Sequence, residues 1–420
     1  MSAERLTPLL VGPCPAEWQQ PYIDEVTDLL TNGFVGPSLP HQTENHETGI
    51  RYLQGFNVRP NKLDLTRTTW VTHDFHSKNR KSQLREGDVL VVQSGHIGTA
   101  AVVPEEAAGS NCHAVIICRF KAGIVDPDFA SQYLNSQIGQ SRLRGLHVGS
   151  SLSHINTSEL GRFKLPLPPL REQRKLVELW GTWDTAIQKT EQLIAAKELS
   201  CQALMQRVFG ENRYPRLRLS ELARRVTRKN VDGNGHPLTI SGSEGLVSQA
   251  GYFGKRIAAE RAEHYTLLRR GEFAYNKSYS AGYPFGAIKR LDTHAEGVVS
   301  TLYLCFALDG CKAPLSDYFT YFCEAGGFNH QIYQVAQEGA RNHGLLNVTA
   351  EDFFAMTMPV PPRDVQERSV RVLGAAMREL ALLRDQLAAL QAQKRGLMQK
   401  LLTGQWRLPT PENVQEVSHA

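Results

Sequence analysis

The side chains of this 420-residue chain that could do chemistry do not form a recognisable catalytic arrangement. His73 and His76 have a spacing that two metal ligands could use, but they stand in a predicted loop, which favours solvated or locally bonded histidines. Gly233-Asn234-Gly235 begins a dinucleotide-binding GxGxxG pattern, in which Leu238 replaces the third glycine. Because GxxxxGK[ST], HExxH and Asn/Asp-Pro-Pro-aromatic motifs are also absent, we predict that the chain catalyses no reaction by itself.

Composition is that of a globular protein with a mild excess of positive charge. Hydrophobic residues make up 41% of the chain, and Lys plus Arg exceed Asp plus Glu by 47 − 42 = 5. This balance permits nucleic-acid binding without requiring it, because the clustering of charge matters more than its sum. The seven scattered cysteines favour free thiols over zinc ligands or disulfides. With no evident signal peptide and no apolar span of about 20 residues, we expect a cytoplasmic protein without a membrane partner.

A long repeat divides the chain into two similar halves. Pro166-Leu167-Pro168-Pro169, Gln173 and Leu204-Met205-Gln206 recur 193 positions later as Pro359-Val360-Pro361-Pro362, Gln366 and Leu397-Met398-Gln399. Solenoid repeats are much shorter, with periods of roughly 20 to 50 residues. The spacing therefore predicts a compact domain followed by a long helix, used twice. Duplex DNA is a partner that offers two separated half-sites to such a chain.

Each copy of the repeat predicts a helix of about 40 residues, or ~60 Å at about 1.5 Å per residue. The first runs from Leu170 to Phe209 before Gly210, and the second from Arg363 to Thr403 before Gly404. A 3–4 spacing of mostly apolar residues marks one face of each helix. We call this face the seam: Leu176, Trp180, Trp183, Ile187, Thr190, Ile194, Lys197, Cys201, Leu204 and Val208, then Ser369, Leu373, Ala376, Leu380, Leu383, Leu387, Leu390, Lys394, Leu397 and Leu401.

Antiparallel pairing of the two helices would bury both seams within one chain. Packing of each helix on its own domain, or on another protein, remains the alternative. Upstream of the helices the sequence looks mixed α and β. The β-branched runs 89–92 and 114–118 predict strands in the first half, and 273–275 and 298–304 predict their counterparts in the second. The fold class predicted is therefore α+β with an internal pseudo-two-fold repeat.

The duplicated segments resemble the specificity subunit of type I restriction–modification systems. The matching stretches are PLPPLREQRKLV at 166–177 and LMQRVFG at 204–210, then PVPPRDVQERSV at 359–370 and LMQKLLTGQWRL at 397–408. GIRYLQGFNV at 49–58, LREGDVLVVQSGHIG at 84–98, LTISGSEGLVSQAGYF at 238–253 and YNKSYSAGYPFGAIKR at 275–290 look like parts of that family's target recognition domains. The second copy departs from the usual Glu-Gln pair by reading Pro-Pro-Arg-Asp-Val-Gln-Glu.

The resemblance implies a division of the chain and a non-catalytic role. Target recognition domains would occupy 1–165 and 211–358, helical spacers 166–210 and 359–408, and a tail 409–420. Such a subunit reads an asymmetric bipartite DNA target, with an unread spacer of roughly half to two-thirds of a DNA turn. Two methyltransferase subunits dock on its helices, and two restriction subunits can join. S-adenosylmethionine, ATP and Mg are then expected on those partners, with no cofactor in this chain.

Candidate DNA contacts are the polar and basic stretches that the sequence places outside the helices, because Arg suits guanine edges, Asn and Gln suit adenine, and Lys and Arg hold phosphates. They are Lys78, Asn79, Arg80, Lys81, Arg142, Arg144, His147, Arg224, Arg225, Arg228, Lys229, Asn276, Lys277, Gln334, Arg341, Asn342 and His343. Tyr275, Tyr279 and Tyr283 are expected to pack rather than to stack on bases. The competing hypotheses are a protein-interaction scaffold that reads no sequence and an unrecognised stand-alone enzyme.

Overall fold

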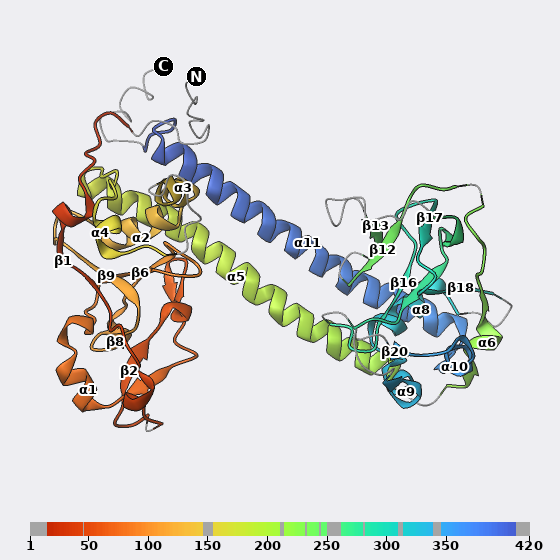
Figure 1. Ribbon diagram of the computed structural model, residues 1–420. Helices are drawn as coiled ribbons and strands as arrows, with labels where there is room; N and C mark the ends of the chain where they lie inside the picture. Colours follow the sequence, from red (N-terminus) through yellow and green to blue (C-terminus); the bar gives the residue numbers. More distant parts are fainter. Residues whose placement is uncertain are drawn as a thin grey trace, which may run out of the picture. The chain divides into compact units, whose positions relative to one another are not determined.

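The computed structural model describes residues 15–44, 46–145, 154–210, 214–231, 233–242, 245–249, 262–279, 282–309, 314–338 and 346–408. The chain forms two compact units (Figure 1). Unit 1 comprises 1–190 and 386–420, and unit 2 comprises 191–385. Each of the two long helices therefore has one portion in each unit.

Unit 1 is built on a four-stranded antiparallel sheet in the order β1-β9-β6-β7, with a second sheet β5-β2-β8 and a β3-β4 hairpin. Its strands are β1 Thr27–Asn32, β2 Ile50–Leu53, β3 Val58–Arg59, β4 Lys62–Leu63, β5 Thr69–Val71, β6 Val89–Val92, β7 Ala100–Val102, β8 Asn111–Cys112 and β9 Val115–Phe120. Its α-helices are α1 His73–Lys78, α2 Pro127–Asn135, α3 Gln137–Gly145, α4 Thr157–Gly161 and the start of α5 Leu170–Phe209. Short 3-10 turns are η1 Ile23–Val26, η2 Leu39–His41, η3 Gly55–Asn57, η4 Arg80–Ser82 and η5 Glu105–Ala107.

Unit 2 repeats this plan with a four-stranded antiparallel sheet in the order β11-β18-β15-β16. Its strands are β10 Arg216–Arg218, β11 Ala223–Arg225, β12 Leu238–Ser241, β13 Gly245–Ser248, β14 Thr266–Arg269, β15 Phe273–Asn276, β16 Ala287–Arg290, β17 Glu296–Val299, β18 Leu304–Leu308, β19 Gln337–Glu338, β20 Leu346–Asn347 and β21 Thr357–Pro359. Its helices are α6 Leu219–Leu222, η6 Ala262–His264, α8 Ser316–Glu324, α9 Asn329–Val335, α10 Ala350–Ala355 and most of α11 Arg363–Leu402.

The two four-stranded sheets have the same topology. In each, the strand that follows a glycine turn (β6 or β15) lies between its hairpin partner (β7 or β16) and the next strand of the sheet (β9 or β18). Val91 pairs with Ile116 in unit 1, and Tyr275 pairs with Leu304 in unit 2. The predicted strands at 89–92, 114–118 and 273–275 are thus confirmed, within a residue or two of their ends.

The single strand predicted over 298–304 is wrong. β17 ends at Val299, the chain turns through Ser300–Tyr303 with Tyr303 N donating to Ser300 O at 3.0 Å, and β18 begins at Leu304. β17 pairs with β14 in one sheet, whereas β18 joins the four-stranded sheet. A run of apolar and hydroxyl residues cannot by itself reveal this break, because the turn uses residues that also suit strands.

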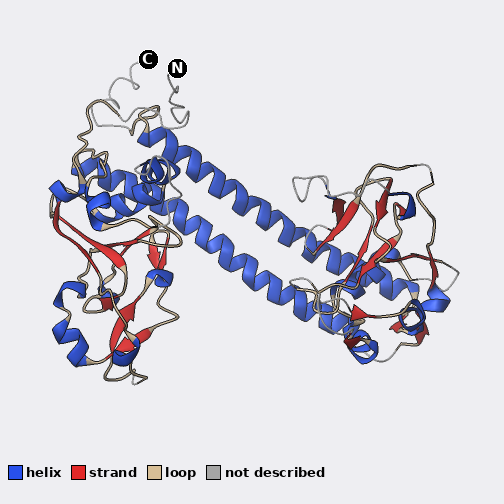
Figure 2. Cartoon of the chain, in the orientation of Figure 1, coloured by secondary structure: helices blue, strands red, loops and turns tan. Residues whose placement is uncertain are grey.

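The helices confirm the predicted limits almost residue for residue. α5 covers 170–209 and α11 covers 363–402, each as a continuous helix (Figure 2). Asp184 pairs with Lys394 inside unit 1, and Lys197 pairs with Glu379 inside unit 2. Because the partner's number falls as the number along α5 rises, the two helices pack antiparallel.

Each helix also contributes side chains to a domain core. The two alternatives, pairing of the helices and packing of each helix on a domain, therefore both occur. Trp180 is fully buried in unit 1 and stacks on Phe129 with ring centroids 6.0 Å apart. The aromatic core of unit 2 contains Phe306, Phe319 and Phe353, and the partly buried Phe209 of α5 packs against it. Among the described residues, no helix is both long enough and apolar enough to span a bilayer.

Candidate nucleic-acid interface

The repeated glutamine attaches each long helix to its domain through main-chain atoms. The Gln173 amide, fully buried, accepts from Asp126 N at 2.8 Å and donates to Ile124 O and Pro168 O at 2.9 and 2.8 Å. Gln366, 4% exposed, accepts from Leu315 N at 2.8 Å and donates to Pro361 O at 2.9 Å. Both bond to the loop that precedes the first helix after the sheet, α2 or α8. We call them the attachment glutamines.

A buried carboxylate closes the glycine turn before the central strand in each unit. Asp88 accepts from Arg85 N at 2.7 Å and binds Arg119 through two bonds of 2.8 Å. Glu272 accepts from Arg269 N at 2.8 Å and binds Arg228 through two bonds of 3.1 Å. The carboxylates raise the pKa of both guanidinium groups further above its usual value. Arg228, a candidate DNA contact, is therefore engaged inside its own unit.

The candidates of unit 1 fall into two separate places. Lys78, Arg80 and Lys81 are exposed on α1 and η4, while Arg142 and Arg144 lie on α3, and Figure 1 shows α1 and α3 at opposite ends of this unit. Lys78 bonds Asp74 at 2.8 Å. The side chains of Arg80 and Lys81 have no ionic or hydrogen-bonding partner among the described residues.

The α3 candidates differ in availability. Arg142 donates to the hydroxyl of Tyr133 at 2.8 Å and lies 5.6 Å from the ring centroid of Phe163, so it is engaged by the domain. Arg144 is exposed without a partner among the described residues. His147 lies outside the described residues.

Most candidates of unit 2 already have partners. Arg224 pairs with Asp309 at 3.1 Å, Lys229 donates to His264 O at 3.3 Å, and Lys277 donates to Val348 O at 3.2 Å. Asn276 is half-buried, and its Oδ1 accepts from Ser278 N. Gln334 is exposed on α9 and bonds His330. Arg225 is exposed, and its side chain has no partner among the described residues. Arg341, Asn342 and His343 lie outside the described residues.

The histidine pair near 75 serves the fold. His76 is bonded to Asn111 at 2.5 Å, while His73 is exposed one turn away. The described residues contain no group of three or more His, Cys, Asp or Glu that could hold a metal ion. The loop predicted for these histidines is wrong, because both lie in α1, whose first turn is capped by the Thr72 hydroxyl. Of the two interpretations that the sequence favoured, His76 is locally bonded and His73 is solvated.

The seam residues all lie on shielded faces. Each of the twenty positions, from Leu176 to Val208 and from Ser369 to Leu401, is buried or half-buried. Trp180, Leu373 and Leu380 are the deepest, at 0%, 1% and 4% exposure, whereas Leu383, Leu387 and Leu390 are half-buried. Trp183, Ile187 and Leu204 are half-buried as well, and Ile194 is buried.

The packing expected of three tyrosines holds for two of them. Tyr275 is fully buried and stacks on Phe353 at 5.2 Å, and the Tyr283 hydroxyl donates to Glu324 at 2.6 Å. Tyr279 is 66% exposed, contrary to that expectation, because it lies beyond the end of β15.

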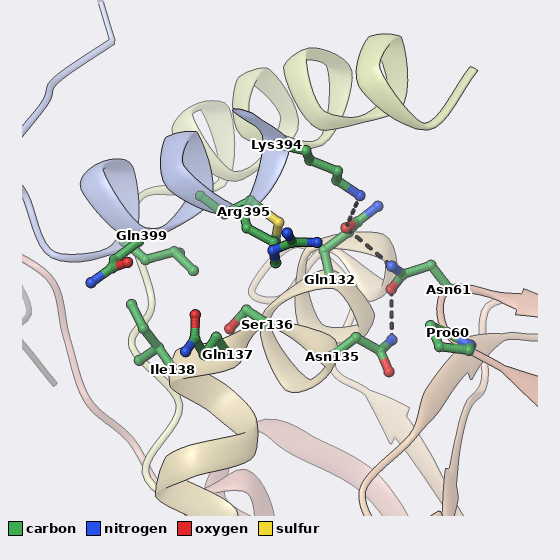
Figure 3. A pocket seen from close by; sticks show the side chains of 12 residues that line it. Pro60, Asn61, Gln132, Asn135, Ser136, Gln137, Ile138, Lys394, Arg395 and Gln399 are labelled. Carbon is green, nitrogen blue, oxygen red and sulfur yellow. Dashed lines mark hydrogen bonds between the residues drawn. The ribbon is translucent and has the colours of Figure 1, made fainter. Parts of the chain in front are cut away.

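A pocket of about 420 Å³ lies in unit 1 where α2 and α3 meet the last turns of α11 (Figure 3). At one side, Lys394 Nζ bonds Asp184 at 2.6 Å and Gln132 at 3.2 Å, and Asn61 donates to Gln132 at 3.1 Å. Asn135 donates to Asn61 at 2.7 Å. Because these groups satisfy one another, this side of the pocket joins the domain to α11 and offers little to a ligand.

Comparison with known proteins gives a consistent result. A model of the type I restriction modification DNA specificity domain matches residues 17–197. The chain is 24% identical over 197 residues to the type I restriction enzyme MjaVIII specificity subunit of Methanocaldococcus jannaschii. That alignment covers 45% of this chain and 45% of the relative, so the match spans less than half of the relative's length.

Two solved structures extend the likeness to nearly the whole fold. The S subunit of the type I restriction–modification system from M. genitalium has a TM-score of 0.53 at 14% identity, covering 95% of this chain and 98% of that one. A chain from a structure concerning complex assembly and conformational transition of the type I R-M system has a TM-score of 0.57 at 16% identity, with 92% and 98% covered. Residues 17–197 of the chain thus match the type I restriction modification DNA specificity domain, and the fold of nearly the whole chain is similar to that of these two type I restriction–modification proteins.

Specificity subunits of type I restriction enzymes are the non-catalytic subunits of those enzymes. In this chain, the sequence repeat marks the attachment glutamines but does not show their role, because the main-chain N–H groups that they accept from lie about 50 residues upstream. It missed Asn111, a fully buried residue that bonds the segment carrying Arg80 and Lys81. A lone Asn in a two-residue strand gives no sequence signal, so only the folded chain reveals it.

Proposed function

We propose that this chain reads an asymmetric, bipartite DNA target for a type I restriction–modification complex. The observation that carries the proposal is the repeat in three dimensions: two sheets of identical strand order, each attached by a buried glutamine to one of two antiparallel helices. Two equivalent domains held by a common pair of helices suit a target with two elements. The major groove is where each base pair can be distinguished, so side chains of both domains are expected to contact it.

The proposed asymmetry rests on how far the two units differ outside their shared framework. Unit 1 carries the exposed, unpartnered Arg80 and Lys81, whereas unit 2 engages Arg224, Arg228 and Lys277 in its own contacts. Two readers with different side chains on equivalent frameworks would recognise different base pairs. The two elements of the target are therefore proposed to be different, with unread base pairs between them.

The partners in this proposal are methyltransferase subunits, with restriction subunits as a further possibility, docked on the long helices. Support comes from large apolar side chains that the helices leave exposed in unit 2: Leu193 at 45%, Leu199 at 69%, Val372 at 51% and Leu382 at 68%. Exposed leucines on a paired helix suit the apolar face of a partner helix. S-adenosylmethionine, ATP and Mg would be bound by those partners, which carry out the chemistry.

Methylation mapping tests the proposal. The chain is co-expressed with its neighbouring methyltransferase, and modified adenines are located genome-wide by single-molecule sequencing. We expect modification at one bipartite motif that is lost when this chain is deleted. A motif that persists without the chain, or no motif at all, would favour the scaffold alternative.

A matched pair of variants separates DNA reading from assembly. Leu373→Asp with Leu380→Asp places two carboxylates in the buried seam and should abolish both assembly and modification. Arg80→Gln with Lys81→Gln removes two exposed charges and should leave co-purification of the methyltransferase unchanged while modification falls. Loss of co-purification in the second variant would contradict this division of labour.

A further inference from the structure

A single buried amide organises the segment that carries Arg80 and Lys81. Asn111 is fully buried in β8, and its Nδ2 donates to Asn79 O at 3.1 Å and to Ser82 Oγ at 2.8 Å. Asn79 and Ser82 flank Arg80 and Lys81 directly in the chain. The chain is therefore tied to the same side chain on both sides of the two cations, through a main-chain oxygen at Asn79 and a side-chain hydroxyl at Ser82. We call Asn79–Ser82 the basic corner.

The third bond of Asn111 fixes α1 to the same point. Because a carbonyl oxygen can only accept, the bond to Asn79 O identifies the Asn111 nitrogen as the donor. Its oxygen is then the acceptor for the protonated Nδ1 of His76, at 2.5 Å. On the inner side of α1, Phe75 is 2% exposed and contacts the rings of Phe34 and Tyr52 at 4.9 and 5.5 Å. The basic corner is thus held in place by the hydrogen bonds of Asn111 and by the packing of α1 on the domain.

The two cations point to a partner outside the domain. Arg80 and Lys81 are exposed, and neither has a carboxylate or hydrogen-bond partner among the described residues. Lys78, one helix turn away, is in contrast neutralised by Asp74 at 2.8 Å. A buried amide that bonds a main-chain oxygen and a hydroxyl three residues apart fixes the path of the chain between them. Here the hub holds two adjacent, unpaired positive charges in a fixed backbone geometry.

We propose that the basic corner is a preorganised clamp for DNA phosphates and that Asn111 is its positioning residue. This inference rests on the proposed function, since it assigns a defined part of the DNA contact to unit 1. Fixing the backbone before binding lowers the conformational entropy lost when the two side chains meet phosphates. Phosphate contacts set the position of the domain on the duplex and carry no base information. The corner therefore contributes affinity and register, and bases are read elsewhere in the unit.

Salt dependence of binding measures the clamp directly. The full chain is titrated against a fluorescein-labelled duplex of about 30 base pairs, with salt varied from about 50 to about 200 mM. The slope of log K against log salt is negative, and each phosphate contact that is lost reduces its magnitude by about 0.9. Arg80→Gln with Lys81→Gln should therefore reduce the magnitude of the slope by roughly 1.8. Lys189→Gln with Arg371→Gln, two exposed cations on the long helices, is the charge-matched control and should leave the slope unchanged.

A double-mutant cycle tests the positioning role of Asn111. Asn111→Ala should weaken binding on the order of tenfold in the wild-type background and less than about twofold when Arg80 and Lys81 are already glutamine. Ser82→Ala, which removes one bond of the hub, should behave in the same way with a smaller loss and serves if Asn111→Ala fails to fold. Both variants should also lower the salt slope, which a loss of stability alone would not do.

The outcomes separate this inference from the proposed function. Equal weakening by Ser82→Ala in both backgrounds would overturn the positioning role of Asn111. Wild-type binding with an unchanged slope in the Arg80→Gln and Lys81→Gln variant would overturn the clamp, while the chain would still bind DNA. A wild-type chain that binds no duplex and directs no methylation would instead overturn the proposed function.

Discussion

The two units share a framework and differ in what they do with their charges. Both sheets have the same strand order, both turns close on a buried carboxylate, and both helices carry an attachment glutamine in their first turn. In unit 2, however, Arg224, Arg228 and Lys277 are held by contacts within the unit, while Arg80, Lys81 and Arg144 of unit 1 have no partner among the described residues. Each unit holds exceptions, because Lys78 and Arg142 of unit 1 are engaged and the side chain of Arg225 in unit 2 has no partner among the described residues. A basic stretch in the sequence therefore does not by itself mark an available charge.

The largest effect is expected at a buried position where the two helices carry side chains of different size. Trp180 and Leu373 occupy the same place in the repeat, and both are buried. Trp180→Ala should cost about 4 kcal/mol in unit 1, and Leu373→Ala about 3 kcal/mol in unit 2, since the larger side chain leaves the larger cavity. Denaturant unfolding followed by hydrogen exchange in each unit measures both. Losses below about 1 kcal/mol would show that neither position anchors its core.

The attachment glutamines give the next largest difference. Gln173→Leu leaves three main-chain partners unsatisfied and should cost about 3 kcal/mol, whereas Gln366→Leu leaves two and should cost about 2 kcal/mol. Thermal unfolding compares the two variants. Gln206→Leu, at an exposed glutamine of the same repeat, is the control and should change little. A reversed order would mean that the surrounding packing, and not the bond count, sets the strength of attachment.

A smaller effect is expected at Lys394, whose counterpart in the first helix is the buried Cys201. Lys394→Cys gives α11 the residue that α5 has at the equivalent position, and it removes the bonds to Asp184 and Gln132. We expect a loss of about 1 kcal/mol in unit 1, because Asp184 is 41% exposed and water relieves its lost pairing. Hydrogen exchange should show this loss in α2 and leave unit 2 unchanged. A loss spread over both units would argue against a local role.

The smallest effect concerns the loss of folding stability at acid pH. Burial lowers the pKa of His113 in unit 1, and burial together with His294 lowers that of His236 in unit 2. A lowered folded-state pKa means that the unfolded chain binds more protons, so this stability is present above about pH 6.5 and declines as the pH falls below it. His236→Gln should flatten the fall of stability between pH 7.5 and pH 5.5. An unchanged slope would mean that other groups dominate the acid response.

The sequence predicted what depends on local pattern and long repeats. The limits of both helices, the seam positions and the strands β6, β9 and β15 followed from heptad spacing, prolines and β-branched runs. The turn at Ser300–Tyr303 did not, because its residues suit strands. Nor could the sequence show that Arg228 binds Glu272, 44 residues away, or that Asn111 holds Asn79 and Ser82. Those contacts depend on register between distant strands, which a single sequence does not fix.

The attachment glutamines touch only peptide groups. Asp126 N, Ile124 O and Pro168 O in one unit, and Leu315 N and Pro361 O in the other, are present whatever side chains those residues carry, apart from the missing N–H of a proline. The joint between helix and reading domain is thus indifferent to most changes in the domain's own sequence. A lineage of such proteins could replace one reading domain with another, and acquire a new DNA target, while the helix pair and the surfaces that meet its partners stay as they are.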